Sequence, residues 1–214
     1  MSIRLRPVLA LALCAGLAGA TGLGTASAAA QSCNLVTDDK GDAKGAAGAV
    51  SDPVVDILSA DVASNAKKIT AVIRVEKLAA TSANYSLGIT WRANFTIGDT
   101  TYAMSAISDR SGVVGQTSYS DPATGQGTIA GSAVAVLDMA KNEVRITSST
   151  VGFADRVNIK PGTAVTDLNV LTGGIFQSPK NPVVNFNLRY ASADTATGGK
   201  TYKAANPSCV AVGK

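Results

Sequence analysis

Apolar and polar residues alternate strictly through segment 85–97, and this alternation restricts how the chain can fold. Seven apolar residues share one phase of it, namely Tyr85, Leu87, Ile89, Trp91, Ala93, Phe95 and Ile97. Because successive side chains of a β-strand point to opposite faces, a period of two predicts strand structure with one face in the core. We therefore expect Trp91, the only tryptophan, to be buried, and Arg92 and Thr96 to lie on the outer face.

The same period recurs along most of the chain. Strands are predicted at 56–62, 69–76, 100–107, 113–119, 128–137, 143–148, 168–171 and 184–190. Turn sequences such as Gly98-Asp99 and Gly198-Gly199 separate them. Helix is expected only as a short piece within 43–50 or 163–170. Short strands separated by turns predict an all-β fold, an antiparallel β-sandwich of the jelly-roll type.

Residues 1–28 have the features of a cleaved signal peptide. Arg4 and Arg6 precede an apolar stretch at 8–23, and Ala26-Ser27-Ala28 matches a small-residue cleavage site, with cleavage after Ala30 as the alternative. Gly16, Gly19 and Gly22 interrupt the apolar stretch and Gly24 follows it, which disfavours a retained membrane anchor. We expect a secreted, extracellular protein in which residues 29–214 form a single β-sandwich domain.

Removal of the signal peptide leaves two cysteines, Cys33 and Cys209, near the two ends of the mature chain. In an oxidising compartment an isolated pair of this kind predicts a disulfide, and two free thiols are the alternative. Bridged Cα atoms lie within about 7 Å of each other, so the two ends must meet. This geometry favours one closed domain.

Composition excludes several function classes. The chain has no histidine, which rules out Ser-His-Asp hydrolysis, histidine-ligated zinc and histidine acid–base catalysis. The net charge is +4, too small to indicate nucleic-acid binding. The only glutamates, Glu76 and Glu143, fall on the polar faces of predicted strands, so a glycosidase with paired carboxylates is a minority hypothesis. We expect no enzymatic activity.

Aspartates are concentrated near the start of the mature chain. Six of the fifteen acidic residues lie between 38 and 61, and all are aspartate: Asp38, Asp39, Asp42, Asp52, Asp56 and Asp61. Oxygen ligands gathered in a loop that contains a glycine, here Gly41, suit Ca²⁺. Asp56 is in phase with the inward residues of its predicted strand, where a carboxylate is costly unless it is paired or bound to a metal. An acidic loop exposed to solvent is the alternative.

The order of these segments resembles a known β-sandwich domain of secreted bacterial proteins. The resemblance rests on 38–43 (Asp-Asp-Lys-Gly-Asp-Ala), on 55–65, on 69–78, on 98–102 (Gly-Asp-Thr-Thr-Tyr), and on Asp194 followed by Gly199-Lys200-Thr201-Tyr202. That domain is similar to carbohydrate-binding module family 9 and to DOMON-like domains. The resemblance implies a structural calcium ion bound by Asp38 and Asp42, together with Asp56 and Asp194.

These observations lead to two hypotheses of function. The first is a secreted binding module for a polysaccharide or another cell-surface component; the second is a structural or protein-interaction domain that binds no sugar. A sugar-binding platform would require exposed aromatic side chains, and Tyr85, Tyr102, Tyr119 and Tyr202 are expected nearer the surface than Trp91. We expect a monomer that binds no nucleic acid and, after signal cleavage, no membrane.

Overall fold

The computed structural model describes residues 31–44, 51–120, 124–153, 157–177 and 188–213. The predicted signal peptide, most of segment 43–50 and the first part of the predicted strand 184–190 lie outside these residues. The described residues contain no helix. Their strands are β1 (Val36–Thr37), β2 (Ile57–Ser64), β3 (Lys68–Val75), β4 (Gly88–Ile97), β5 (Thr100–Asp109), β6 (Gly112–Ser120), β7 (Gly127–Asp138), β8 (Glu143–Ser149), β9 (Val151–Phe153), β10 (Val157–Asn158), β11 (Ala164–Gln177), β12 (Leu188–Ala196) and β13 (Tyr202–Lys203).

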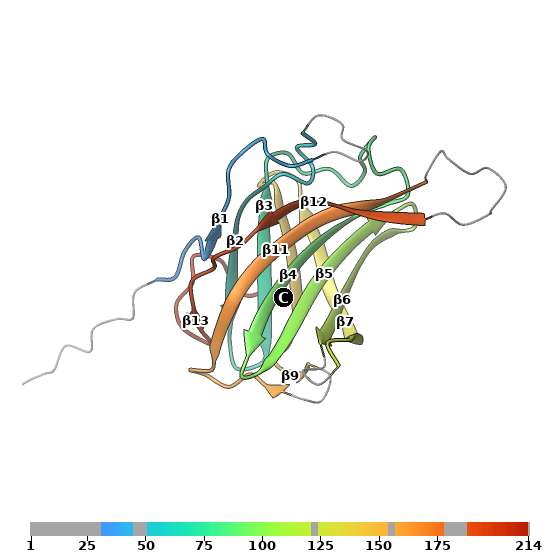
Figure 1. The fold of residues 1–214 in the computed structure, drawn as a ribbon. Coiled ribbons are helices and arrows are strands. Elements are labelled where there is room, and N and C mark those ends of the chain that lie inside the picture. The colour runs from blue at the N-terminus through green and yellow to red at the C-terminus, as the bar shows by residue number, and fades with distance from the viewer. Residues whose placement is uncertain (1–30, 45–50, 121–123, 154–156, 178–187, 214) are drawn as a thin grey trace, which may run out of the picture.

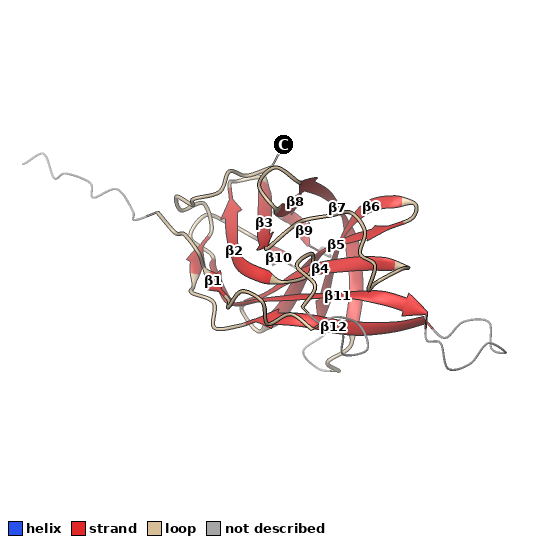
Figure 2. Cartoon of the chain, turned by 90° about the horizontal axis from the view of Figure 1, so that it is seen from above, coloured by secondary structure: helices blue, strands red, loops and turns tan. Residues whose placement is uncertain are grey.

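One antiparallel sheet contains most of these strands, in the order β1-β2-β3-β8-β7-β6-β5-β4-β11-β12, and β13 pairs with β11. β9 and β10 form a separate two-stranded sheet. The large sheet curls around the core (Figure 1), and the view from above shows its strands arranged around the interior (Figure 2). The predicted all-β antiparallel fold is confirmed, and its main strands form one nearly closed sheet.

β11 replaces the short helix that was considered within 163–170. It is the longest strand, and it pairs with β4 on one side and with β12 on the other. Pairing on both sides satisfies its backbone hydrogen-bonding groups, and such tertiary context overrides weak local preference. The helix expectation is therefore wrong for this segment.

The interior is filled by the apolar phase of the alternating segments. Trp91 and Phe95 on β4 are fully buried, as the alternation predicts, and the Trp91 Nε1–H donates to the carbonyl oxygen of Val54 at 3.1 Å. Arg92 and Thr96 lie on the opposite face of β4 and are half-buried. The predicted strand begins later than expected, because residues 85–87 form a turn before Gly88.

Three of the four tyrosines that were expected near the surface are buried instead. Tyr85, Tyr102 and Tyr202 are each about 2% exposed or less. Burial of a tyrosine requires a partner for its hydroxyl, and the Tyr85 hydroxyl donates to Lys44 O at 3.0 Å, while that of Tyr202 donates to Asn206 O at 3.0 Å. The ring of Tyr85 also lies against the backbone of Gly174, where any side chain would collide with it.

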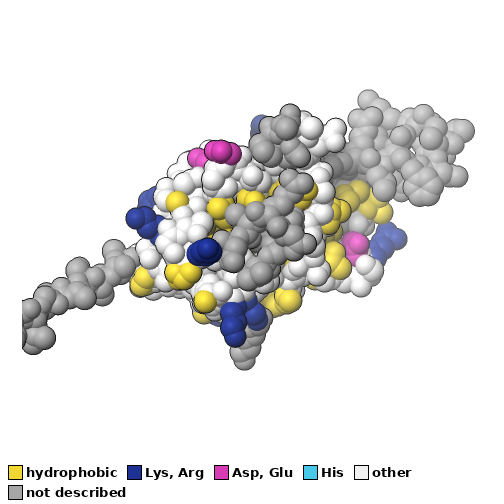
Figure 3. Space-filling view, turned by 90° about the horizontal axis from the view of Figure 1, so that it is seen from below, with side chains coloured by type: hydrophobic (Ala, Val, Ile, Leu, Met, Phe, Trp, Pro, Cys, Tyr) yellow, Lys and Arg dark blue, Asp and Glu magenta, His cyan; other side chains and the backbone are white. Residues whose placement is uncertain are grey.

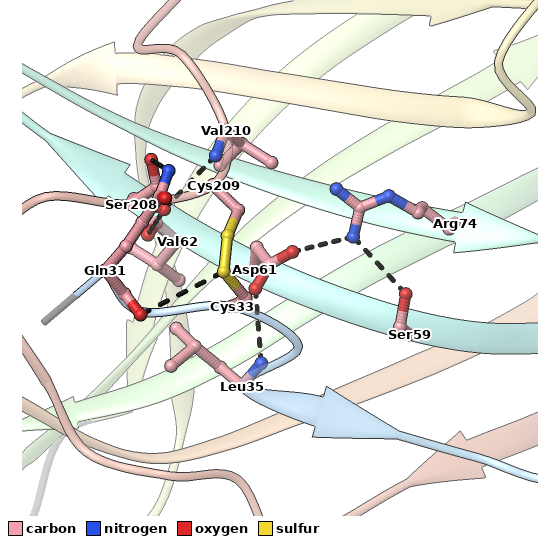
Figure 4. The surroundings of a disulfide bond; sticks show 10 residues. All are labelled: Gln31, Cys33, Leu35, Ser59, Asp61, Val62, Arg74, Ser208, Cys209 and Val210. Atoms are coloured by element: carbon pink, nitrogen blue, oxygen red, sulfur yellow. Dashed lines mark hydrogen bonds and ion pairs between the residues drawn. A yellow bond between two sulfur atoms is a disulfide. The ribbon is translucent and has the colours of Figure 1, made fainter.

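The two ends of the described chain lie side by side. Cys33 and Cys209 have Cα atoms 5.2 Å apart and form a disulfide, which confirms the predicted pairing (Figure 4). Next to it, Ser32 N–H donates to Pro207 O at 3.0 Å and Cys209 N–H donates to Ser32 O at 3.1 Å. Beyond the disulfide, Val210 packs against Ala63 and Val72, on the outer side of β2 and β3.

The disulfide should contribute strongly to stability, because it closes a loop with a sequence separation of 176 residues. The chain-entropy model gives about 5 kcal/mol as an upper value for a loop of this length. We expect the double variant Cys33→Ser, Cys209→Ser to lose several kcal/mol of unfolding free energy, measured by denaturant titration. Oxidised wild type treated with a reductant should match the variant, and equal midpoints for the oxidised and reduced forms would contradict the prediction.

Candidate metal site at the seam of the sheet

The candidate site lies where the two edges of the curled sheet face each other. We call this region the seam: residues 38–44 and 56–57 on one side, and residues 193–195 of β12 on the other. One backbone hydrogen bond crosses it, in which Lys44 N–H donates to Ala193 O at 2.7 Å. A carboxylate also crosses it, since Asp194 Oδ2 accepts the Ile57 N–H at 2.7 Å.

The loop 38–44 is held in place from beneath by Asp56. Asp56 is fully buried, and its two oxygens accept the N–H groups of Gly41 at 2.8 Å and Ala43 at 3.4 Å. Gly41 has a φ of 89°, a backbone conformation that favours glycine. On the outer side of the loop, Lys40 forms an ion pair with Glu76 at 3.0 Å. These contacts give the loop a defined shape.

This shape gathers three carboxylates from two distant parts of the sequence. Asp38, Asp42 and Asp194 each place one oxygen within 4.8 Å of the others. Asp42 is exposed, and it borders a surface hollow of about 300 Å³ that is also lined by Lys44, Asp194 and Thr195. The group thus combines partly buried ligands with one that solvent can reach.

The electrostatics of the triad favour a bound cation or proton. Burial raises the pKa of Asp194 from 3.8 to about 6, backbone N–H donors from Ile57 and Thr195 oppose the shift, and the negative charges of Asp38 and Asp42 add to it. Burial also raises the pKa of Asp38. Its Oδ2 atom is buried and accepts no hydrogen bond from the described residues, a costly arrangement that a metal ion would relieve.

Of the four predicted ligands, the structure brings together Asp38, Asp42 and Asp194, while Asp56 stands apart from this group. Both Asp56 oxygens are engaged by loop N–H groups, which oppose the rise in its pKa that burial causes. Asp56 therefore positions the loop that carries two of the ligands. Its inward phase was visible in the sequence, but the partners that it would find were not.

Two further aspartates of the cluster, Asp52 and Asp61, have separate structural roles. Asp52 accepts hydrogen bonds from Val54 N–H and from the Asn84 side chain. Asp61 accepts Leu35 N–H and pairs with Arg74 at 2.6 Å (Figure 4). Arg74 also forms an ion pair with Glu143, and Glu143 forms a second ion pair with Arg145. Both glutamates of the chain are thus in ion pairs, Glu76 with Lys40 and Glu143 with two arginines.

Removing Asp194's charge should change how stability depends on pH in the presence of EDTA. A carboxyl whose pKa is raised on folding stabilises the folded state most below pH 3.8, and this contribution is lost as the pH rises through about 6. We expect the melting temperature of wild type, relative to Asp194→Asn, to fall across this range. The melting temperature of Asp39→Asn should follow that of wild type across the same pH range. A difference in melting temperature between wild type and Asp194→Asn that does not change with pH would contradict the raised pKa of Asp194.

No helix long and apolar enough to cross a membrane occurs in the described part of the chain. Comparison with protein families, with curated proteins and with solved structures found no match for this chain.

Proposed function

We propose that this protein is a secreted, non-enzymatic binding module whose sheet is closed by a structural Ca²⁺ ion at the seam. The observation that carries the calcium proposal is the triad of Asp38, Asp42 and Asp194 with the buried, unsatisfied Oδ2 of Asp38. Three carboxylates provide hard oxygen ligands of the kind that Ca²⁺ prefers, and backbone carbonyls or water would complete its shell of six to eight.

Export supports the choice of Ca²⁺, because Ca²⁺ binding sites of modest affinity are typical of extracellular modules. The predicted signal peptide and the Cys33–Cys209 disulfide both point to an oxidising, extracellular location. The resemblance to carbohydrate-binding module family 9 and DOMON-like domains adds a polysaccharide or another cell-surface component as the class of ligand.

The buried aromatic residues favour a second candidate, a structural or protein-interaction domain. Trp91, Phe95, Tyr85, Tyr102 and Tyr202 all lie in the core, and Tyr119 is half-buried against it. Among the residues whose side chains are described, none forms an exposed aromatic platform for stacking on sugar rings. Sugar binding through the described side chains would therefore depend on hydrogen bonds and charge.

Calcium should stabilise the mature protein, residues 29–214, at neutral pH. A ligand that binds only the folded state adds about 2.7 kcal/mol when its concentration is one hundred times Kd. We expect the melting temperature to rise with millimolar Ca²⁺ and to fall in EDTA, with a smaller response to Mg²⁺. Differential scanning calorimetry measures the shift.

Two neighbouring aspartates provide a matched pair of variants for this measurement. Asp42 and Asp39 are both exposed and close in sequence, but only Asp42 belongs to the triad. Asp42→Asn should abolish most of the calcium response, and Asp39→Asn should retain it. Identical melting curves in Ca²⁺ and EDTA, or equal responses of the two variants, would exclude the site.

A glycan array probed with the mature protein, in Ca²⁺ and in EDTA, distinguishes the two candidate functions. Retention of any polysaccharide supports the binding module. Absence of retention throughout the array favours the structural or protein-interaction domain.

A further inference from the structure

An outward-facing groove of about 450 Å³ lies on the side of the sheet opposite the core, across β11, β4, β5 and β6. These strands are neighbours in the sheet and lie side by side in Figure 1. The groove is lined by the outer-face residues Thr90, Arg92, Asn94, Ser105, Ile107, Gln116 and Leu171.

The groove arises from the sizes of residues that pair across the strands. Leu171 pairs with Arg92, Arg92 with Ser105, and Ser105 with Gln116, so one row crosses all four strands. Ser105 is only 3% exposed although it lies on the outer face. A small side chain between two long ones leaves a hollow, with Ser105 as its floor and Arg92 and Gln116 as its sides.

Arg92 is held in one orientation but lacks an acidic partner. Its Nε–H donates to Asn94 Oδ1 at 2.7 Å, and the Asn94 side chain donates to Asn169 Oδ1 at 2.8 Å. By contrast, Arg74 and Arg145 both pair with Glu143. No described carboxylate forms an ion pair with Arg92, and no residue that lines the groove is acidic. Its terminal amino groups remain available for a bidentate contact with an anion.

The other lining residues suit a sugar chain better than a peptide. Thr90, Ser105 and Gln116 provide hydroxyl and amide groups, which can bond to sugar hydroxyls, and Ile107 and Leu171 provide apolar contact. A peptide that adds to a sheet needs an unpaired strand edge, whereas β4 and β5 are each paired on both sides.

Figure 3 shows the molecule from below, where basic side chains are scattered among apolar and uncharged side chains and a few acidic side chains are also visible. The groove, in contrast, combines a fixed cation with polar groups in one hollow.

We propose that this groove binds an acidic polysaccharide, with a uronate carboxylate on the Arg92 guanidinium and sugar hydroxyls on Thr90, Ser105 and Gln116. This inference rests on the proposed function, since it names the class of ligand for the binding module. It assigns recognition to a face that is distinct from the calcium triad.

Isothermal titration of the mature protein in Ca²⁺ tests the proposal with three probes: an oligogalacturonate, the same oligomer with its carboxylates methyl-esterified, and an oligoglutamate of similar length. Loss of the charge-assisted contact should weaken binding by about tenfold or more, so the esterified oligomer should bind that much less tightly. Added salt should weaken binding of the uronate. Absence of uronate binding, or equal affinity for either of the other probes, would overturn the proposal.

Two arginine variants distinguish uronate binding in the groove from binding that depends only on the net charge of the protein. Arg92→Gln should weaken uronate binding by at least about tenfold, whereas Arg110→Gln should bind within about twofold of wild type. Arg110 is exposed in the β5–β6 turn and does not line the groove, so it controls for net charge. Melting curves of both variants verify folding, and Arg92→Lys, which keeps the charge without the planar fork, should have intermediate affinity.

The outcomes also separate this inference from the proposed function. Unchanged binding by folded Arg92→Gln overturns the groove but leaves a binding module with its ligand elsewhere. Retention of only neutral glycans on the array would likewise overturn the groove proposal and leave a binding module. A missing calcium response, in contrast, overturns the seam site and leaves the groove untouched.

Discussion

The near-closure of a single curled sheet is the constraint on which the rest of this structure depends. An open sheet would leave backbone N–H and C=O groups unpaired along its two edges, and such edges invite aggregation. Here the edges meet at the seam, where Asp194 Oδ2 accepts the Ile57 N–H and Lys44 N–H donates to Ala193 O. Asp194 is thus a structural bridge between β12 and β2 as well as a member of the acidic triad.

The meeting of the two sheet edges also brings negatively charged side chains close together, which is unfavourable. The loop 38–44 forms one side of the seam, and the meeting of the two sides brings Asp38 and Asp42 to Asp194. Burial raises the pKa of Asp194 to about 6, and repulsion from Asp38 and Asp42 adds to this shift. The proposed cation would resolve the conflict without giving up the hydrogen bond to Ile57, so an ion site would be located at a joint of the fold and not in a cleft.

Much of the fold could be predicted from the sequence, because alternation is a local property. The faces of Trp91 and Arg92 follow from the period of two, and the bounds of β2, β3, β5, β6, β7 and β8 agree with the predicted strands within a few residues. Tyr102 was expected near the surface because its neighbours could not be known, yet it stacks on Phe95 with ring centroids 6.3 Å apart.

The candidate sites were less predictable, since both depend on contacts between distant segments. Asp38 and Asp42 stood out by composition, but Asp194 was suggested only by the resemblance, and the role of Asp56 required knowledge of the Gly41 and Ala43 N–H groups. The groove depends on the register of four strands, which places Ser105 between Arg92 and Gln116. No pattern within one segment carries that information.

The disulfide also determines how the molecule would respond to mechanical force. A pull applied to the chain before Cys33 and after Cys209 would pass from one segment to the other through a covalent bond between neighbouring atoms. The 176-residue interval would carry no tension, so its strands would be neither sheared nor unzipped. A protein held at a surface on one side and loaded on the other could thereby keep its seam and its groove intact under forces that would extend a reduced chain.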